Sequence, residues 1–501
     1  MRYLSAFLAL AFFVQTPKPA EKWSVGLSTS GAQIEALMLP GRSASVPTVL
    51  IIGGLQGKDN TAAVITKEVE TLEATPQANR AFRLLAIPSA NPDGTPLQFP
   101  PTGVAYRENP ESNALWRWIA LQAPDLVLIA GTSDSNLATA LSENEVAGIG
   151  KIPAQRVAAE AGILKSVPAE IQPSEARQEI ERRRARTPGQ VAVELSQIYG
   201  NDFDQVTYMP GMAVIAQMRM GRTSDASRLL APYLNGAKDA LTRPNSQTLA
   251  GHLVFAELAE RSKDDRALKL VRRAAELGFA ENGEMKESMP FHEEMSDSVF
   301  MAIPLLAKAG KLTGDRKYFD MAARHLTFMQ KLDLRPDGLY RHSPLAEAAW
   351  GRGNAFPALG LALALSDFPK DHPEFNRMLK AFQQHITALV KFQDENGMWR
   401  EVVDHPGAYS EFTATAMIGT AIVRGIRNGW LDARTYQPRA ERAWRAILAR
   451  TGSDGKLIDV CESTGKQRSL NDYLKRAAVN DRDQRGGGMA MLFATEMAVL
   501  K

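Results

Sequence analysis

The sequence predicts two folded domains, an α/β domain followed by an all-α domain. The length of 501 residues, at 45% hydrophobic and 23% charged composition, is globular and too great for a single core. From residue 21 to about residue 165, short apolar runs (VLII, RLLAIP, DLVLIA) alternate with helical segments, as in α/β folds. From about residue 189 onward strand signals nearly vanish, and apolar residues recur at helical spacing. The change of pattern predicts a multidomain chain.

Residues 1–20 have the layout of a secretory signal peptide. They read MRYLSAFLALAFFVQTPKPA, with one arginine, an apolar run and then a polar, proline-bearing end. The alternative is an N-terminal membrane anchor, although the apolar run is short for a bilayer span. The single cysteine, Cys461, excludes an internal disulfide. We therefore expect a periplasmic or secreted bacterial protein with no membrane span after cleavage of the signal.

The α/β domain is predicted to cover residues 21–165, and a linker to follow at 166–188. The linker, SVPAEIQPSEARQEIERRRARTP, contains prolines and many charges and leads into a helix. Its run ERRRAR is interpreted as a solvated surface, because an isolated basic run on a connector seldom binds nucleic acid. A net charge of +3 likewise gives no support for a nucleic-acid partner. The sequence does not predict an oligomeric state.

The all-α domain is predicted to cover residues 189–501. Successive helices end at polar turns such as ERSKDDRA and GKLTGDRKY, and the next helix begins directly after. This weak repeat of paired helices predicts an α/α toroid or solenoid. The apolar helical stretches are VAVELSQIY, GMAVIAQMRM, TLAGHLVFAELAE, SVFMAIPLLAKAG, FPALGLALALS, TATAMIGTAIVRGI and GGGMAMLFATEMAVL.

Two stretches of the first domain carry a recognisable motif. VLIIGGLQGKDN (49–60) and AIPSANPDG (86–94) resemble the zinc carboxypeptidases of the M14 type, in which Gly-Gly-x-His-Gly-x-Glu follows a strand and Asn-Pro-Asp-Gly follows later. The resemblance continues through 102–119 and 123–134. It places Gln56 and Asp59 at the zinc-ligand positions and Ala130 or Gly131 at that of the second histidine. It also implies that Arg107 grips a substrate carboxylate.

The zinc ligands of that resemblance are missing. A catalytic zinc is held by three His, Glu or Asp side chains, and the first of the seven histidines in this chain is His252. A remodelled metal site at Gln56 and Asp59 is the alternative, but glutamine is a poor zinc ligand. We therefore predict no metal site and no zinc-peptidase activity. The domain is interpreted as a degenerate carboxypeptidase-like domain, kept for folding or for covering the second domain.

Three stretches of the second domain combine aromatic, basic and acidic residues at helix starts. Asp297 precedes an apolar helix, where the ordinary role of an aspartate is helix capping. A glycine-rich turn at 337–360 contains His342, Trp350, Arg352 and Asn354, and the stretch 392–432 contains Trp399 and Glu411. Tryptophan can stack on a sugar ring and arginine can bind a carboxylate with two hydrogen bonds. Together they predict a rim that binds acidic sugars.

These motifs resemble the unsaturated glucuronyl and rhamnogalacturonyl hydrolases of glycoside hydrolase families 88 and 105. The similarity extends over residues 190–500. It rests on Ser296-Asp297-Ser298-Val299-Phe300-Met301, Gly338-Leu339-Tyr340-Arg341-His342, Trp350-Gly351-Arg352-Gly353-Asn354, Gly397-Met398-Trp399 with Glu411, and Asn480-Asp481 with Gly486-Gly487-Gly488 and Glu496. The resemblance implies an (α/α)6 barrel for this domain.

The resemblance also implies a reaction. These enzymes hydrate the C4=C5 double bond of an unsaturated uronic acid that a polysaccharide lyase has left on an oligosaccharide, and the product then falls apart. One aspartate both protonates C4 and takes a proton from the attacking water, without a cofactor or metal. By position this catalytic residue is Asp297. The implied substrate-binding residues are His342, Trp350, Arg352, Asn354 and Trp399.

Two positions depart from the family pattern. Ser246, next to Asn245, stands where a second aspartate is usual, and Met295 stands where an aromatic residue is usual. These departures imply an altered substrate choice, a weakened activity or an inactive protein, and two alternatives to the hydrolase stay open. One is a catalytically inactive glycan-binding or scaffolding protein built from two degenerate enzyme domains. The other is a metal-free hydrolase or lyase that acts on an intact acidic glycan.

Overall fold

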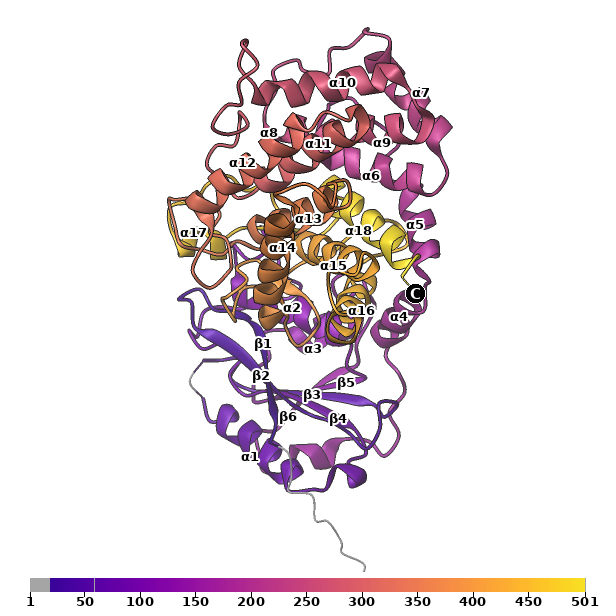
Figure 1. The fold of residues 1–501 in the computed structure, drawn as a ribbon. Helices are drawn as coiled ribbons and strands as arrows, with labels where there is room; N and C mark the ends of the chain where they lie inside the picture. Colours follow the sequence, from indigo (N-terminus) through magenta and orange to yellow (C-terminus); the bar gives the residue numbers. More distant parts are fainter. Residues whose placement is uncertain (1–18, 58, 501) are drawn as a thin grey trace, which may run out of the picture.

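The computed structural model describes residues 19–57 and 59–500. Figure 1 shows a sheet domain at one end of the molecule and a large helical domain above it. The predicted signal peptide lies almost wholly outside the described residues. Within them, no helix combines the length and apolar character needed to cross a membrane.

The sheet domain is built on six strands in the order β1-β2-β4-β3-β5-β6. Strands β3, β4, β5 and β6 are parallel to one another, and β1 and β2 add an antiparallel edge. The predicted runs VLII, RLLAIP and DLVLIA form β3, β4 and β5, which are buried on both faces as parallel strands usually are. The strands are β1 Glu21–Leu27, β2 Gln33–Leu39, β3 Thr48–Ile52, β4 Arg83–Ile87, β5 Leu126–Ala130 and β6 Ala154–Val157.

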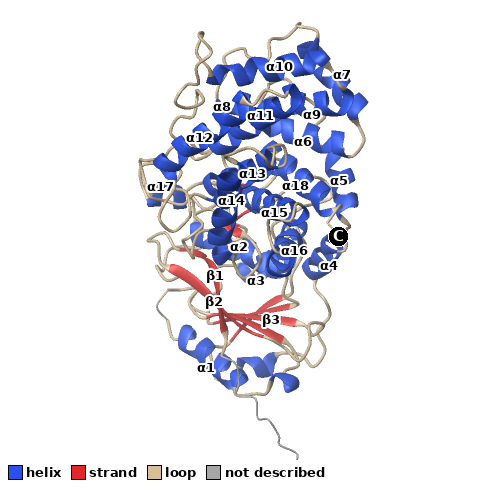
Figure 2. Ribbon diagram, in the orientation of Figure 1, coloured by secondary structure: helices blue, strands red, loops and turns tan. Residues whose placement is uncertain are grey.

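Helices cover both faces of this sheet. Helix α1 (Thr61–Glu73) lies on the face directed away from the helical domain, and α2 (Pro110–Gln122) and α3 (Leu137–Glu143) lie on the face directed toward it (Figure 2). The core on the α2 side also includes Ala449 and Ile458 of the second domain. The two domains therefore share part of one hydrophobic core.

The predicted linker contains the helix α4 (Glu175–Arg184), which packs against α16 (Ala433–Ala449) of the helical domain. Ser174 caps this helix by accepting a hydrogen bond from the Arg177 amide. The side chains of Arg183 and Arg186 donate hydrogen bonds to main-chain carbonyls at the end of α16. The basic run is thus partly used to attach the connector to the second domain.

The helical domain is a closed ring of helix pairs. Its inner ring runs from α6 through α8 and α9, α11, α13 and α15 to α18, which packs back against α6. An outer helix lies against each inner position, in the order α7, α10, α12, α14, α16 and α5. This is the arrangement of an (α/α)6 barrel. The seven apolar stretches of the sequence correspond to α5 and the inner ring, because inner helices are covered on all sides.

The helices of this domain are α5 Pro188–Ser196, α6 Tyr208–Arg219, α7 Thr223–Leu234, α8 Ser246–Gly251, α9 Leu253–Ser262, α10 Asp265–Ala275, α11 Ser298–Thr313, α12 Lys317–Asp333, α13 Gly351–Leu365, α14 Phe375–Leu389, α15 Phe412–Arg427, α16 Ala433–Ala449, α17 Leu470–Leu474 and α18 Gln484–Met497. Two small antiparallel ladders complete it: β7 (Trp399–Arg400) with β8 (Ser410–Glu411), and β9 (Val460–Cys461) with β10 (Ala478–Val479).

Candidate active site

A cavity of about 220 Å³ lies where the inner helices begin. Its wall is formed by the first residues of α6, α8, α11, α13 and α18 and by the segment 463–465. Helix N-termini carry partial positive charge, so their convergence favours an acidic ligand. The lining residues used below are Tyr208, Asn245, Ser246, Met295, Asp297, Trp350, Arg352, Ser463, Thr464, Gly465 and Arg485.

Asp297 occupies the N-cap position of α11 without capping it. Its backbone is helical, with φ −49° and ψ −32°, and within the described residues its side chain makes no capping hydrogen bond. The carboxyl is 13% exposed, and Oδ1 lies 3.3 Å from Nε2 of His342. That contact is poorly aligned, so Oδ1 has no hydrogen-bond partner in the described part of the chain. The interpretation of Asp297 as only a helix cap therefore does not fit, and its carboxyl is available to a ligand.

His342 is fully buried behind Asp297 and does not line the cavity itself. Its Nδ1 lies 2.8 Å from the Tyr473 hydroxyl, and its ring centroid lies 4.3 Å from that of Trp350. One ring nitrogen thus faces Tyr473 and the other faces Asp297. His342 therefore lies behind the aspartate and outside the cavity lining, and not in the direct substrate contact that the resemblance implied.

Trp350 and Arg352, two of the predicted substrate-binding residues, line the cavity. The guanidinium of Arg352 lies over the Trp350 ring, 4.6 Å from its centroid. Its two terminal nitrogens donate to the carbonyls of Cys461 at 2.6 Å and Glu462 at 2.8 Å. The fork that we expected to grip a substrate carboxylate is therefore occupied by main-chain oxygens. Arg352 contributes its charge to the cavity and fastens the segment after β9.

Two buried glutamates support these side chains from behind. Glu401 accepts a hydrogen bond from Nε1 of Trp350 at 3.1 Å, and burial together with the charge of Glu411 raises the pKa of Glu401 well above its ordinary value. Glu411 caps α15 and also accepts from the Cys461 amide at 2.9 Å. Arg352 lies 3.8 Å from Glu411. The arrangement pairs one buried cation with Glu411, while Glu401, whose pKa is raised, holds its proton to higher pH than an ordinary glutamate.

Asn354 and Trp399 lie outside the cavity, contrary to the sequence-based expectation. The amide group of Asn354 bonds the main chain of Tyr340 and Trp350, which ties the glycine-rich turn to the start of α13. Trp399 is fully buried and donates from Nε1 to the Leu389 carbonyl at 2.7 Å. Neither side chain is placed to contact a molecule in the cavity. Both are satisfied core residues, which is the ordinary role of such side chains.

The two departures from the family pattern do face the cavity. Ser246 and Met295 both line it, and Asn245 beside Ser246 caps α8 by accepting from the Thr248 amide. The position where a second aspartate is usual therefore carries a neutral hydroxyl in the cavity wall.

Arg485 is a lining residue that the sequence analysis missed. It stands in the first turn of α18, and its side chain is bound by Asp483, the N-cap of the same helix. Its Nε lies 3.0 Å from Oδ1 of Asp483, and the side chain is 14% exposed. The available signal was its place at the start of an apolar helix, which it shares with Asp297 and Arg352.

A second acidic group near the site was also missed. Asp333, at the end of α12, is completely buried, and both of its carboxyl oxygens lack a hydrogen bond within the described chain. The nearest cation is Arg341, whose Nε lies 3.8 Å away. Burial, assisted by the charges of Asp297 and Glu294, raises the pKa of Asp333 to about 8.

We expect Asp333→Asn to change how stability depends on pH. An unfolded aspartate ionises near pH ~3.9, whereas Asp333 in the folded protein holds its proton to about pH 8, so parent stability falls as the pH rises between these values. Asparagine cannot ionise and loses this dependence. The melting temperature of Asp333→Asn, relative to the parent, should therefore rise from pH 5 to pH 8.5. Asp265 is exposed, so the control Asp265→Asn should differ from the parent in melting temperature by the same amount at pH 5 and pH 8.5. If Asp333→Asn also differs from the parent by the same amount at both pH values, the raised pKa of Asp333 is refuted.

Within the described chain, the positions of the first domain that the sequence resemblance assigned to zinc ligands hold no cluster of metal-binding groups. Asp59 accepts from the Thr61 amide at the start of α1, and Gln56 lies 3.4 Å from the Ser135 hydroxyl. Across residues 19–57 and 59–500, no group of three or more His, Cys, Asp or Glu side chains could hold a metal ion. Arg107 pairs with Glu462 of the second domain.

Comparison with solved structures supports the fold of the helical domain. A structure described as "a possible member of GH105 family" from Salmonella enterica serovar Paratyphi A is 22% identical, with a TM-score of 0.53 over 66% of this chain and 96% of that chain. A second structure with the same description, from Klebsiella pneumoniae, is also 22% identical, with a TM-score of 0.54 over 66% of this chain and 95% of that chain. These likenesses show the (α/α)6 barrel.

Curated relatives match part of the same region. An unsaturated rhamnogalacturonyl hydrolase, YesR, from Bacillus subtilis is 26% identical over 216 residues, which are 41% of this chain and 60% of that protein. An unsaturated 3S-rhamnoglycuronyl hydrolase from Alteromonas sp. is 26% identical over 220 residues, 41% of this chain and 51% of that protein. The match thus spans 51–60% of these relatives' length, less than two thirds.

The family model described as Glycosyl Hydrolase Family 88 matches residues 212–501, which is more than half of the chain. The matched region contains Asp297, Trp350, Arg352 and Arg485, and thus most of the lining of the candidate cavity. This chain belongs to glycosyl hydrolase family 88.

Proposed function

We propose that the protein hydrates the C4=C5 double bond of an unsaturated uronic acid at the end of a lyase-generated oligosaccharide. The observation that carries this proposal is the Asp297 carboxyl, which faces the cavity, caps no helix and is held beside His342. A single carboxyl in this setting suits a reaction that needs one group to give and then take a proton.

The chemistry follows from the electrons of the enol ether. Protonated Asp297 donates its proton to C4, and the π pair of the double bond forms the new C–H bond. The positive charge that develops at C5 is shared with the ring oxygen, and a water adds at C5 while the Asp297 carboxylate takes a proton from it. The resulting hemiketal opens, C1 becomes a hemiacetal, and the remaining sugar leaves as an alcohol. Asp297 is again protonated at the end.

The charges of the cavity suit the uronate carboxylate. Arg352 and Arg485 both line the cavity, and the inner helices direct their N-termini toward it. Both terminal nitrogens of Arg352 donate to carbonyls, whereas Arg485 donates to Asp483 through Nε and Nη2 and its Nη1 has no acceptor among the described residues, so Arg485 is better placed to meet the ligand. We therefore assign the carboxylate contact to Arg485 and the supporting charge to Arg352.

The proposal is tested by the absorbance of the substrate. The C4=C5 uronate absorbs in the ultraviolet, and hydration removes the chromophore. Lyase-digested pectin is the first substrate to test because the relatives are named for rhamnogalacturonyl and rhamnoglycuronyl groups. Loss of absorbance with purified protein supports the proposal. Binding of the fragments without any loss would favour the second candidate, an inactive glycan-binding protein, which the neutral Ser246 in the cavity wall supports.

Arg485→Gln should weaken substrate binding more than it slows the chemistry. A hydrogen bond to a charged group contributes about 1.5–3 kcal/mol, so KM should rise roughly tenfold or more while kcat changes little. Arg482→Gln is the matched control, because Arg482 is exposed, lies just before α18 and donates to the Asp454 carbonyl outside the cavity. Equal KM values for Arg485→Gln and the parent would remove Arg485 from the binding site.

We further propose that the first domain derives from a zinc carboxypeptidase and acts neither as a peptidase nor with a metal. Support comes from its mixed sheet, in which β3 leads into Gly53 and Gly54 as the motif requires, and from Gln56 at a ligand position. Elemental analysis of purified protein, followed by a chelator added to the hydrolase assay, tests this. Stoichiometric zinc would overturn it.

A further inference from the structure

The segment after β9 forms one wall of the active-site cavity. Ser463, Thr464 and Gly465 line the cavity directly. The two residues before them, Cys461 and Glu462, present the carbonyl oxygens that hold Arg352. The position of this short segment therefore sets both the shape of the wall and the orientation of the buried arginine.

The first domain contacts this segment through an ion pair between Arg107 and Glu462. Nη2 of Arg107 bonds Oε1 of Glu462, which also receives Nη2 of Arg476 at 2.8 Å and the Ala477 amide at 3.1 Å. The Arg107 side chain is 44% exposed and that of Glu462 is 26% exposed. An exposed pair of this kind adds little to overall stability. Arg107 is the donor from the first domain among the three that hold Oε1 of Glu462, at one end of the cavity wall.

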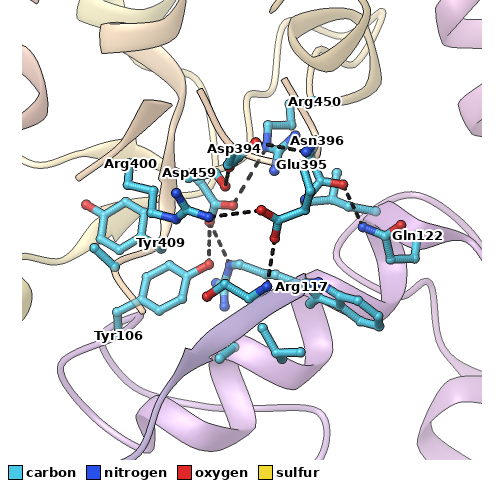
Figure 3. Close-up of a pocket in the computed structure, with 17 residues that line it drawn as sticks. Tyr106, Arg117, Gln122, Asp394, Glu395, Asn396, Arg400, Tyr409, Arg450 and Asp459 are labelled. Carbon is cyan, nitrogen blue, oxygen red and sulfur yellow. Dashed lines mark hydrogen bonds and ion pairs between the residues drawn. The ribbon is translucent and has the colours of Figure 1, made fainter. Parts of the chain in front are cut away.

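Tyr106 holds the other end of the same stretch. Its hydroxyl donates to Oδ1 of Asp459 at 2.9 Å, and its ring stacks on that of Tyr409, with centroids 4.3 Å apart and planes 6° apart (Figure 3). Arg117 of α2 also lies 3.5 Å from Asp459 and faces the Tyr106 ring. Asp459 is buried with a φ of +65°, a backbone conformation that needs support from its surroundings.

We propose that Tyr106 and Arg107 are positioning residues for the active site, through which the first domain holds residues 459–462 and thereby the cavity wall and Arg352. This inference rests on the proposed function for its catalytic consequence. It assigns the first domain a place in the hydrolase: the arginine that in a carboxypeptidase would bind a substrate carboxylate here binds a carboxylate of the neighbouring domain.

The inference is tested first without substrate, in the full-length protein. Arg107→Ala should increase hydrogen–deuterium exchange in peptides that cover 461–466. Arg107→Lys keeps a positive charge opposite the Glu462 carboxylate, so it should restore part of the protection from exchange. Gln122→Ala is the matched control, because it removes a 2.9 Å hydrogen bond to Asn396 at the same domain interface without touching the segment. Unchanged exchange in Arg107→Ala, or an equal increase in Gln122→Ala, would overturn the inference.

Kinetics with the chromophoric substrate form the second arm. A displaced wall should raise KM roughly tenfold in Arg107→Ala while kcat stays near the parent value, because Asp297 and His342 do not touch the segment. Glu462→Gln should give a similar KM, and the double variant should be no worse than either single variant, since both remove one interaction. Additive effects would contradict the pairing. A parent protein without turnover would refute the proposed function only, and the exchange experiment would still decide this inference.

Discussion

Asp297→Asn should reduce turnover of an unsaturated uronide by about 10²–10⁴-fold, the range that general acid–base catalysis contributes. Asparagine keeps the shape of the side chain but cannot give a proton to C4 or take one from water. The melting temperature should stay close to that of the parent, because the Asp297 side chain caps no helix in the described structure and carries no hydrogen bond at Oδ1. The measurement is the initial rate of loss of ultraviolet absorbance at saturating substrate.

A matched control separates catalysis from helix capping. Asp432 is the N-cap of α16, accepts a hydrogen bond from the Thr435 amide and lies away from the cavity. Asparagine also caps helices well, so Asp432→Asn should change neither turnover nor stability. Parent-level turnover by Asp297→Asn would end the catalytic assignment and favour the glycan-binding alternative. Binding of the oligosaccharide by Asp297→Asn, measured by calorimetry, should persist.

Arg352→Met should lower the free energy of unfolding by about 3–5 kcal/mol, the cost of removing one partner from a buried ion pair. The guanidinium is 2% exposed, lies 3.8 Å from the fully buried Glu411 and saturates two carbonyls. Methionine fills similar space but leaves the carboxylate without its cation and both carbonyls without donors. Arg352→Lys keeps the charge but loses the planar guanidinium, so its free energy of unfolding should lie between those of the parent and Arg352→Met. Urea denaturation followed by circular dichroism measures the difference.

The control for this stability effect is an exposed arginine. Arg228 pairs with Asp225 on the surface of α7, where the two side chains are 76% and 54% exposed. Arg228→Met should stay within about 0.5 kcal/mol of the parent. If Arg352→Met unfolds at the same urea concentration as Arg228→Met, the buried network does not depend on the Arg352 charge.

The sequence predicted the fold best where burial is complete. Strands β3, β4 and β5 are unbroken apolar runs because helices cover both faces of the sheet, and the inner helices are apolar on every side. Strand β1, which reads EKWSVGL, has no such signal because it lies at a sheet edge and is half exposed. The pattern of apolar residues along the sequence indicates which elements are buried. Edge strands and connectors are partly exposed, so they do not show this pattern.

The candidate site was predicted in part for a related reason. Asp297, Trp350 and Arg352, which the motifs singled out, line one cavity, since each stands at the start of an inner helix. They could not tell that Asn354, two residues after Arg352, turns into the core, because residues this close on a helix face different sides. Arg485 and the wall at 463–465 were missed because the ring closure brings them to the cavity from distant parts of the chain.

The packing of α18 on α6, which closes the inner ring of helices, determines the order in which the two domains can fold during synthesis. Helix α18 completes the inner ring by packing on α6, and the Arg219–Glu496 ion pair at 3.0 Å joins residues 277 positions apart. A ribosome must therefore produce nearly all of the helical domain before its core can close, and until then the apolar faces of α6, α11 and α13 stay uncovered on the growing chain. The sheet domain, whose strands all precede residue 158, can form its hydrogen-bonded framework long before. The sheet domain can thus be folded while the helical domain is still being synthesised.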